Sequence, residues 1–319
     1  MNNIDLINNL ITNQNKLLEQ MNGLIERQNQ ILQNQQSTTT REVFVNDIDH
    51  DEMRNGFLVT SHRKKLWNVQ IGLINEFARV CKKHNLKWFA FYGTLLGAAR
   101  HKGFIPWDDD SDVVMFRPDY EKFKRIAAEE LKYPYRLYNW YDYSHEADGE
   151  ISSEYEKTLP LITIRQTIEC PMWWPCRPMM RIVDPRTTML SFDARKKLYT
   201  GIWLDIFPLD SVTPFSDERQ AANFETAREL LIATVYPQNV KKVIENNQRL
   251  LVSAKVLNEF IKKSYRQKGI FFDNFMDKTF HASGSVGLIS KFCFPEDSPP
   301  ATHEVKNFEK TVYLPFEKI

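Results

Sequence analysis

The segment ahead of one apolar strand reads Pro106-Trp107-Asp108-Asp109-Asp110-Ser111-Asp112-Val113-Val114-Met115, with four carboxylates in a short space. Side chains alternate across a strand, so Asp110 and Asp112 are expected on one face, and Asp108 with them. Carboxylates this close repel one another and keep their protons unless a cation balances the charge. Oxygen ligands at this density suit Mg²⁺ or Mn²⁺. The pattern predicts a metal site formed by Asp108, Asp110 and Asp112; the alternative is a solvated acidic turn.

A second feature precedes these carboxylates, where the apolar run over residues 87–92 stops at Gly93 and Thr94. Glycine lets the backbone turn tightly and come close to a ligand. The Thr94 hydroxyl would stand beside the N–H groups at the start of a helix, an arrangement that suits a phosphate. Turns that only connect a strand to a helix have the same pattern, so both interpretations stay open.

A further carboxylate, Asp205, lies inside the apolar strand expected over residues 201–207. A charge in an apolar strand is costly unless it is paired or bound to a metal. Asp205 is therefore the candidate third carboxylate, as a metal ligand or as the base for an acceptor hydroxyl. The alternative is an aspartate that caps the following turn.

Cations near the carboxylates are candidates for binding phosphate. Arg100, His101 and Lys102 come shortly before the acidic run, and Arg186 lies further along the chain. Arginine and lysine bind phosphate oxygens through charge-assisted hydrogen bonds. Cations are equally expected at the C-terminal end of a helix, so the first three residues have two interpretations.

The Gly-Thr turn followed by Asp-x-Asp on the next strand is the layout of the nucleotidyltransferase superfamily. The longer run over residues 92–112 closely resembles the signature of the LicD family, and residues 181–188 and 203–210 agree with it in order. Members of that family include bacterial phosphocholine transferases and relatives of the fukutin-related proteins. The resemblance covers residues 60–319 and is thinner from residue 217 onward.

The resemblance implies a metal-dependent transfer of a phospho-alcohol, such as phosphocholine or ribitol phosphate. A CDP-activated donor would give this group to a hydroxyl of a cell-surface glycan, as in lipopolysaccharide or teichoic acid, and release CMP. Phosphoryl transfer needs positioning and charge neutralisation, which Mg²⁺ (or Mn²⁺) held by Asp110 and Asp112 would supply. The alternatives are a nucleotide-binding scaffold without catalysis and a nucleotidyltransferase that acts on another acceptor.

The chain departs from the family pattern at two places. Ser111 stands where an aliphatic residue is usual, and we expect it to face the core, away from the metal. The family tends to end with Tyr-Gly-Asp after a Leu-Pro-Phe segment, whereas Leu314-Pro315-Phe316 is followed by Glu317, Lys318 and Ile319. We therefore expect that a C-terminal segment is missing or truncated.

The first 36 residues differ from the rest in being rich in Asn and Gln, with apolar residues that repeat every seven positions. One row is Ile4, Ile11, Leu18, Ile25 and Leu32. Sustained heptads predict a coiled coil, and hence a homo-oligomer joined through residues 1–36. The alternative is one amphipathic helix docked on its own domain. Residues 37–60 are interpreted as a polar linker and residues 61–319 as a LicD-like nucleotidyltransferase-fold domain.

The remaining pattern favours an α/β (or α+β) fold, with a nucleotidyltransferase-like mixed sheet flanked by helices. Helices are expected over 64–84, 95–101 and 119–131, and helical pieces broken at Pro237 and Gly269 over 217–281. Strands are expected over 87–92, 111–116, 135–140, 159–167, 179–183 and 201–207, the last ending at Pro208, with short strands and loops over 285–316. Trp107 is expected to pack in the core.

Charge and hydropathy exclude several classes of protein. Lys and Arg number 42 against 41 Asp and Glu, so a formal net charge of +1 gives no overall field for nucleic acid. No apolar run approaches the length of a transmembrane segment, and the N-terminus has no signal pattern. The expected location is cytoplasmic, with peripheral attachment at the inner face of the membrane as an alternative.

Overall fold

The computed structural model describes residues 45–142, 178–190, 199–211, 218–235, 237–245, 250–280, 288–289, 302–303 and 305–317. The chain divides into two compact units, Met1–Val43 and Phe44–Ile319. All of the described residues belong to the second unit. The coiled coil expected over 1–36 and the strand expected over 159–167 lie outside the described residues.

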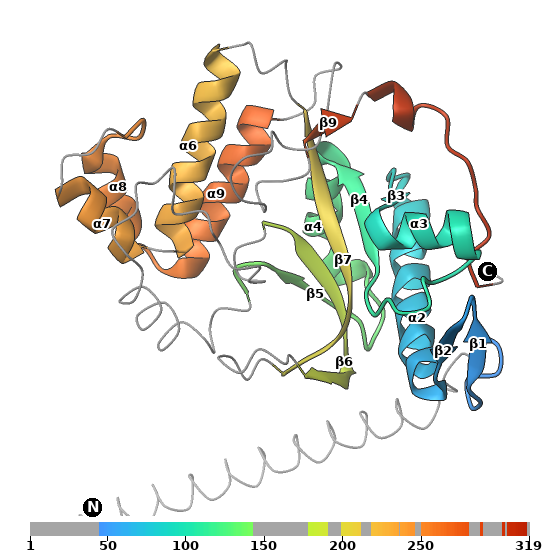
Figure 1. Cartoon of the computed structure of the whole chain (residues 1–319). Coiled ribbons are helices and arrows are strands. Elements are labelled where there is room, and N and C mark those ends of the chain that lie inside the picture. The colour runs from blue at the N-terminus through green and yellow to red at the C-terminus, as the bar shows by residue number, and fades with distance from the viewer. Residues whose placement is uncertain are drawn as a thin grey trace, which may run out of the picture. The chain divides into compact units, whose positions relative to one another are not determined.

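A mixed sheet forms the centre of the second unit (Figure 1). Its strands, in spatial order, are β3 (Phe89–Ala90), β4 (Asp112–Phe116), β7 (Tyr199–Ser211), β6 (Met180–Leu190) and β5 (Arg136–Asn139). The β4–β7 pair is parallel, and the other pairs on this path are antiparallel. Two short strands, β8 (Leu288–Ile289) and β9 (Thr302–His303), continue from the end of β7. Together with the helices, this sheet confirms the expected mixed α/β fold.

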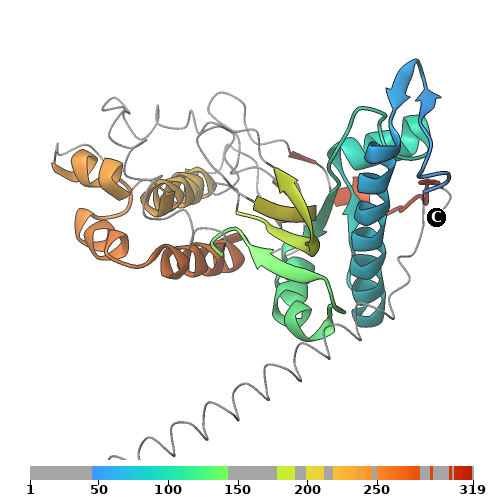
Figure 2. The same cartoon turned by 90° about the horizontal axis from the view of Figure 1, so that it is seen from below.

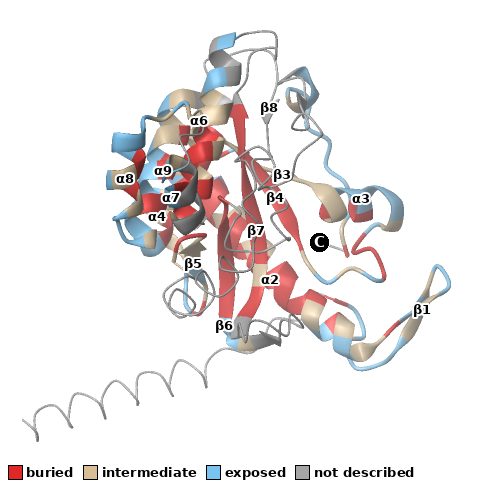
Figure 3. Ribbon diagram, turned by 60° about the vertical axis from the view of Figure 1, so that its left-hand side comes forward, coloured by how far each residue is buried: buried red, intermediate tan, exposed pale blue. Residues whose placement is uncertain are grey.

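One face of the sheet is covered by α2 (Ser61–His84) and α4 (Arg117–Glu130). The helix α2 begins where the Thr60 hydroxyl accepts a hydrogen bond from the Arg63 N–H, and it ends at Asn85 in the left-handed conformation. Phe77 of α2 packs in a buried cluster with Val113 and Met115 of β4. Since side chains alternate along β4, Asp112 and Val114 point to the opposite face. Figure 3 shows that β4 and β7 are buried along most of their length.

A second core lies among the helices of the C-terminal half. These helices are α6 (Glu218–Val235), α7 (Pro237–Glu245), α8 (Ala254–Ile261) and α9 (Tyr265–Phe280), which Figure 2 shows gathered together. They bury Trp140, which follows β5, together with Phe260 and Phe272. The break expected at Pro237 is confirmed, because this proline starts α7. The break expected at Gly269 is wrong, because this glycine lies inside α9. A Cβ atom at this position would come within 2.5 Å of the Tyr141 ring.

Part of the stretch interpreted as a linker is folded. Within residues 45–60, β1 (Glu52–Arg54) and β2 (Phe57–Val59) form a hairpin. Asn55 and Gly56 have the positive φ values of 49° and 79° that a tight hairpin turn requires. Val45 and Val59 are fully covered and pack with Trp67 of α2. The polar residues of this stretch concealed a short hairpin whose inner face is apolar.

The strand β7 continues past Pro208, which was expected to end it. The Asp205 N–H donates to the Ser111 carbonyl on the β4 side, so Pro208, three positions on, presents its nitrogen to the β6 side. The pairing with β6 ends at Ile206. The proline therefore costs no hydrogen bond of the sheet.

The strand expected over 87–92 is shorter than predicted. It is β3 (Phe89–Ala90), because the helix α3 (Tyr92–His101) already begins at Tyr92.

Candidate functional site

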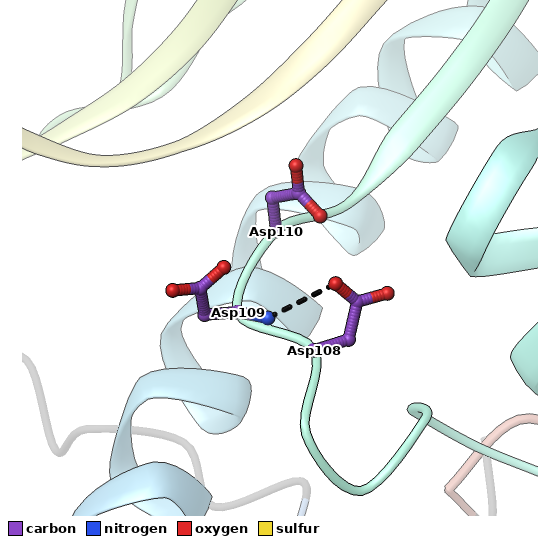
Figure 4. A group of neighbouring side chains, drawn as sticks. All are labelled: Asp108, Asp109 and Asp110. Carbon is purple, nitrogen blue, oxygen red and sulfur yellow. Dashed lines mark hydrogen bonds between the residues drawn. The ribbon is translucent and has the colours of Figure 1, made fainter.

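Carboxylates from two neighbouring strands meet at the start of β4. Asp112 is the first residue of β4, and it lies beside Asp205 in the parallel register with β7. Carboxylate oxygens of Asp110, Asp112 and Asp205 all lie within 4.8 Å of one another. Asp110 also belongs to a second such group with Asp108 and Asp109 in the preceding loop, drawn in Figure 4. We call Asp108, Asp110, Asp112 and Asp205 the carboxylate site.

Arg181 of β6 lies next to this site and was not identified as a site residue from the sequence. It is paired in register with Asp205, and its guanidinium makes two hydrogen bonds to that carboxylate, one of them 3.2 Å from Nη2 to Oδ2. The guanidinium also stacks over the Trp203 ring at 4.1 Å. Both Arg181 and Asp205 are buried. Arg181 therefore fixes the orientation of Asp205 and balances one of the clustered charges.

The surroundings of Asp110 disfavour its negative charge. Burial, and after it the neighbouring charges of Asp108 and Asp205, together raise its pKa to about 7. Each of these causes disfavours the ionised form. A divalent cation would reverse them, because it stabilises the ionised carboxylate.

The loop that carries the carboxylates is held by three side chains on one face of α2. The Arg63 guanidinium and the Trp67 indole N–H donate to the Asp108 carbonyl at 2.8 and 3.0 Å. The Gln70 amide donates to the Asp109 carbonyl at 2.7 Å. The spacing of three and four residues places these donors on one side of the helix. They anchor the backbone of the loop through its carbonyl groups.

Gly93 and Thr94 lie against the carboxylate site, at the first turn of α3. A Cβ atom on Gly93 would come within 2.4 Å of the Asp108 carboxylate, so glycine is needed for this close approach. The backbone strain falls on the preceding Tyr92, with φ at 41°. The Thr94 hydroxyl accepts a hydrogen bond from the Asp112 N–H at 2.8 Å. Both residues thus position the carboxylates, and their contact with a phosphate stays a prediction.

The proposed phosphate-binding cations lie further away. Arg100 and His101 form the last turn of α3, about 10 Å along the helix axis from Gly93. His101 Nδ1 lies 2.7 Å from the Asn55 amide of the β1–β2 hairpin. Lys102 ends the helix in the left-handed conformation, and its N–H donates to Gly97. These positions are those of cations at a helix C-terminus.

Arg186 is likewise separated from the carboxylates. It makes two hydrogen bonds to the Asp184 carboxylate, at 3.0 and 2.7 Å. It follows Arg181 by five positions on β6, which corresponds to about 15 Å along the strand. Trp107, by contrast, directly precedes the carboxylates and is 58% exposed rather than in the core. It is held at its edges by Phe57 and His101.

The donor set fits a hard divalent cation. It consists of carboxylate oxygens alone, close enough together to share one ion, and Mg²⁺ and Mn²⁺ prefer such oxygen ligands. Asp110 and Asp112 would hold the ion, with Asp205 facing them from β7. Neither histidine nor cysteine belongs to this group of described residues.

Known proteins resemble the segment that carries the loop. Residues 85–161 match the family model described as LicD/FKTN/FKRP, nucleotidyltransferase domain. The lipopolysaccharide cholinephosphotransferase LicD of Haemophilus influenzae is 34% identical over 88 residues, which are 28% of this chain and 33% of that protein. An uncharacterized protein of Rickettsia typhi is 37% identical over 65 residues, 20% of this chain and 21% of its own length.

The matched segments are short relative to the proteins that contain them. The match spans a third of the Haemophilus protein and about a fifth of the Rickettsia protein. The family match includes Gly93, Thr94 and the acidic run, and it ends before Asp205. No solved structure matches the chain. Among the described residues, no helix has the length and apolar character needed to cross a membrane.

Proposed function

We propose that this chain, which belongs to the LicD family through residues 85–161, transfers a phospho-alcohol to a glycan hydroxyl. The donor would be a CDP-activated alcohol of the choline or ribitol type, the acceptor a cell-surface glycan such as lipopolysaccharide, and the released product CMP. The observation that carries this proposal is the meeting of Asp110 and Asp112 with Asp205 on the neighbouring strand. A group of carboxylates with excess negative charge is what a metal-assisted reaction of a diphosphate requires.

The reaction would be a direct displacement at phosphorus. The acceptor oxygen forms a bond to the phosphorus that carries the alcohol, and the bond from that phosphorus to the CMP oxygen breaks. The acceptor proton passes to a carboxylate oxygen. A bound Mg²⁺ would neutralise charge on the diphosphate, and Asp110 and Asp112 are the residues that would hold it.

Asp205 has two possible roles in this mechanism, as a metal ligand or as the base. Its pairing with Arg181 supports a fixed orientation in either role. As base, one of its oxygens would accept the proton of the acceptor hydroxyl. Its position beside Asp112 brings that oxygen next to the metal ligands.

The start of α3 supports binding of the donor phosphates beside the metal. The helix begins after Phe91, whose side chain supplies no cap. N–H groups at such a terminus attract anions. Gly93 and Thr94 are in this first turn. The proposed donor-binding cations lie away from the carboxylates, so any contact they make would be with parts of the donor distant from the metal. These cations are Arg100, His101, Lys102 and Arg186.

Melting temperatures measured with nucleotides test the proposal against its alternatives. Purified protein is heated with Mg²⁺ and CDP-choline, CDP-ribitol, CTP, UTP or ATP. Stabilisation by a CDP-alcohol supports the transferase, and release of CMP with a glycan acceptor then establishes turnover. Stabilisation by ATP alone supports another nucleotidyltransferase reaction, and stabilisation by none supports a scaffold. The Asp112→Asn variant serves as the control for the site.

Assembly through residues 1–36 is a separate proposal, supported by the heptad pattern alone. Light scattering on the full chain and on a chain that starts at Thr40 would give the number of copies in each. A single-copy mass for the full chain would exclude oligomerisation through these residues.

A further inference from the structure

The C-terminal segment of the described chain returns to the loop that leads into the acidic run. This segment comprises the short 3-10 helix η3 (Val305–Phe308) and the residues up to Glu317 (Figure 1). Phe308 packs against Phe89 of β3 at 4.9 Å between ring centres. Phe316 packs against Phe104, just ahead of the carboxylates, at 4.8 Å. Residues distant in sequence thus support the site from one side.

Glu317 makes the most specific contacts of this segment. Its carboxylate is buried and accepts a hydrogen bond from the Phe104 N–H at 3.1 Å. The Arg54 guanidinium, from the β1–β2 hairpin, donates to both carboxylate oxygens at 2.5 and 3.1 Å. The Glu317 N–H in turn donates to the Lys102 carbonyl at 2.8 Å. One residue therefore connects the hairpin, the end of α3 and the loop.

Two glycines show how closely these parts fit. A Cβ atom on Gly103 would come within 2.1 Å of the Glu317 carboxylate oxygen. A Cβ atom on Gly97 of α3 would come within 2.4 Å of the Gly103 carbonyl oxygen. The loop is thus enclosed between α3 and Glu317. Glu317 itself has a φ of 49°, a conformation that a non-glycine residue keeps only when its contacts outweigh the strain.

A second route leads from Glu317 to the carboxylate site through Arg54. The Arg54 guanidinium lies over the Trp67 ring at 5.1 Å, and this ring stacks on Phe104 at 4.9 Å. The Trp67 indole N–H donates to the Asp108 carbonyl. Glu317 thus contacts the loop directly at Phe104 and reaches Asp108 through Arg54 and Trp67.

We propose that Glu317 is a positioning residue, which holds the loop 103–110 so that Asp110 can bind a divalent cation together with Asp112 and Asp205. This inference rests on the proposed function, since it assigns Glu317 a role at the same metal site. Groups that orient the ligands of a metal affect its affinity without touching it. Glu317 lies outside the segment 85–161 that matches the family model.

Mn²⁺ affinity and backbone hydrogen exchange test this proposal. Glu317→Gln keeps the size of the side chain and removes the charge that pairs with Arg54. We expect Mn²⁺ binding, measured by electron paramagnetic resonance, to weaken about tenfold, as is typical when a supporting group is lost. We also expect faster amide exchange over residues 103–112. Arg54→Met should have the same two effects, and the double variant should be little worse than either single one.

Glu229→Gln is the matched control. Glu229 is a buried carboxylate that accepts hydrogen bonds from the Leu251 and Val252 N–H groups, at 2.8 and 2.7 Å, in the helical region. It should lower the melting temperature without changing Mn²⁺ affinity or exchange over 103–112. If Glu317 contributes only to stability, Glu317→Gln will likewise lower the melting temperature without changing Mn²⁺ affinity or exchange over 103–112. The proposal would then be wrong.

The outcome also separates this inference from the proposed function. If the wild-type protein binds no Mn²⁺, the metal-dependent function fails, and hydrogen exchange alone decides the role of Glu317. Unchanged exchange over 103–112 in folded Glu317→Gln overturns the positioning role in either case. Faster exchange with unchanged Mn²⁺ affinity would show that Glu317 holds the loop without affecting metal binding, which overturns the proposal.

Discussion

Buried charges lie at both ends of the paired strands β4 and β7, and the two groups are balanced in different ways. At one end, Asp112 of β4 lies beside Asp205 of β7, and Asp110 completes a group of three carboxylates. At the other end, Arg117 follows β4 and binds Asp210 of β7 through two hydrogen bonds, at 2.6 and 2.8 Å. The first group has excess negative charge, and the second is made of opposite charges.

The second group extends from the sheet to the C-terminal helices. We call it the paired cluster; its members are Arg117, Glu121, Lys124, Asp210 and Asp273. Burial works against the charge of Arg117, but Asp210 and Glu121 outweigh it and raise the pKa of the guanidinium. Asp273 of α9 binds Lys124 and accepts a hydrogen bond from the Trp140 indole at 3.0 Å. The paired cluster thus ties α4, β7 and α9 together.

The difference separates a structural role from a functional one. Buried ions that are paired and hydrogen-bonded contribute to a folded arrangement, and removing one partner leaves the other uncompensated. Buried carboxylates that repel one another destabilise the fold unless a cation binds them. The proposed function therefore belongs to the carboxylate site, and the paired cluster has the contacts of a structural group.

The largest effect is expected from neutralising the carboxylate site. Asp110→Asn and Asp112→Asn should each lower the rate of CMP release on the order of a thousandfold, because the ion's contribution of several kcal/mol would be lost. Both variants should fold, since removing one charge relieves repulsion. Circular dichroism provides the control for folding. If both variants turn over near the wild-type rate, this site is an ordinary acidic turn and not a metal site.

The opposite pattern is expected at the paired cluster. Asp210→Asn leaves Arg117 buried with only Glu121 to balance it, so unfolding in urea should show a loss of about 3 kcal/mol. Mn²⁺ affinity should not change. Glu259→Gln removes an exposed ion pair with Lys262 and should have no measurable effect on stability. If Asp210→Asn is as stable as wild type, the assigned structural role is wrong.

A pH dependence should distinguish the two ends. Burial and the neighbouring charges of Asp108 and Asp205 raise the pKa of Asp110 to about 7, whereas an unfolded aspartate titrates near 3.9. The folded metal-free protein therefore holds a proton that the unfolded chain has released, so stability falls as the pH rises between these values and then levels off. Metal binding requires the ionised form, so Mn²⁺ affinity should rise about tenfold per pH unit below that pKa and level off above it. An affinity that does not change with pH below neutrality would contradict the assignment of Asp110 as a ligand.

The smallest effect concerns the face of β4 opposite the carboxylates. Ser111 is fully buried there, as predicted, and its hydroxyl has no hydrogen-bond partner among the described residues. Ser111→Ala removes the unsatisfied group and should raise the free energy of unfolding by about 1 kcal/mol. CMP release should keep its rate. A loss of stability in Ser111→Ala would contradict this prediction.

Local sequence patterns predicted the parts of the site that depend on neighbouring residues. Proximity in sequence indicated that Asp110 and Asp112 lie close together, as they do, but Asp110 is in the loop before β4 and not on the strand. Asp108, which was expected on the same face, groups with Asp109 and Asp110 in that loop. The apolar surroundings of Asp205 identified it as a candidate third carboxylate. The aliphatic pattern of the helices and strands gave the mixed α/β fold. Each of these inferences needs only the geometry of one element.

Contacts between distant elements could not be predicted in this way. The pairing of Arg181 with Asp205 depends on the register of β6 with β7, and Glu317 meets Arg54 across nearly the whole chain. The distances of Arg100 and Arg186 from the carboxylates could not be predicted either, because they depend on how α3 and β6 are placed relative to β4. Gln70 gave a usable signal, since an amide on the buried face of a helix needs a partner.

The central claim is that the carboxylate site is destabilising until a divalent cation binds. Melting temperatures of wild type, Asp110→Asn and Asp210→Asn, each with and without Mg²⁺, test it directly. We predict that Mg²⁺ stabilises wild type, that Asp110→Asn melts no lower than wild type without Mg²⁺ and gains little from it, and that Asp210→Asn melts lower yet keeps the Mg²⁺ effect. Equal stabilisation of wild type and Asp110→Asn by Mg²⁺, or none in wild type, would contradict the claim.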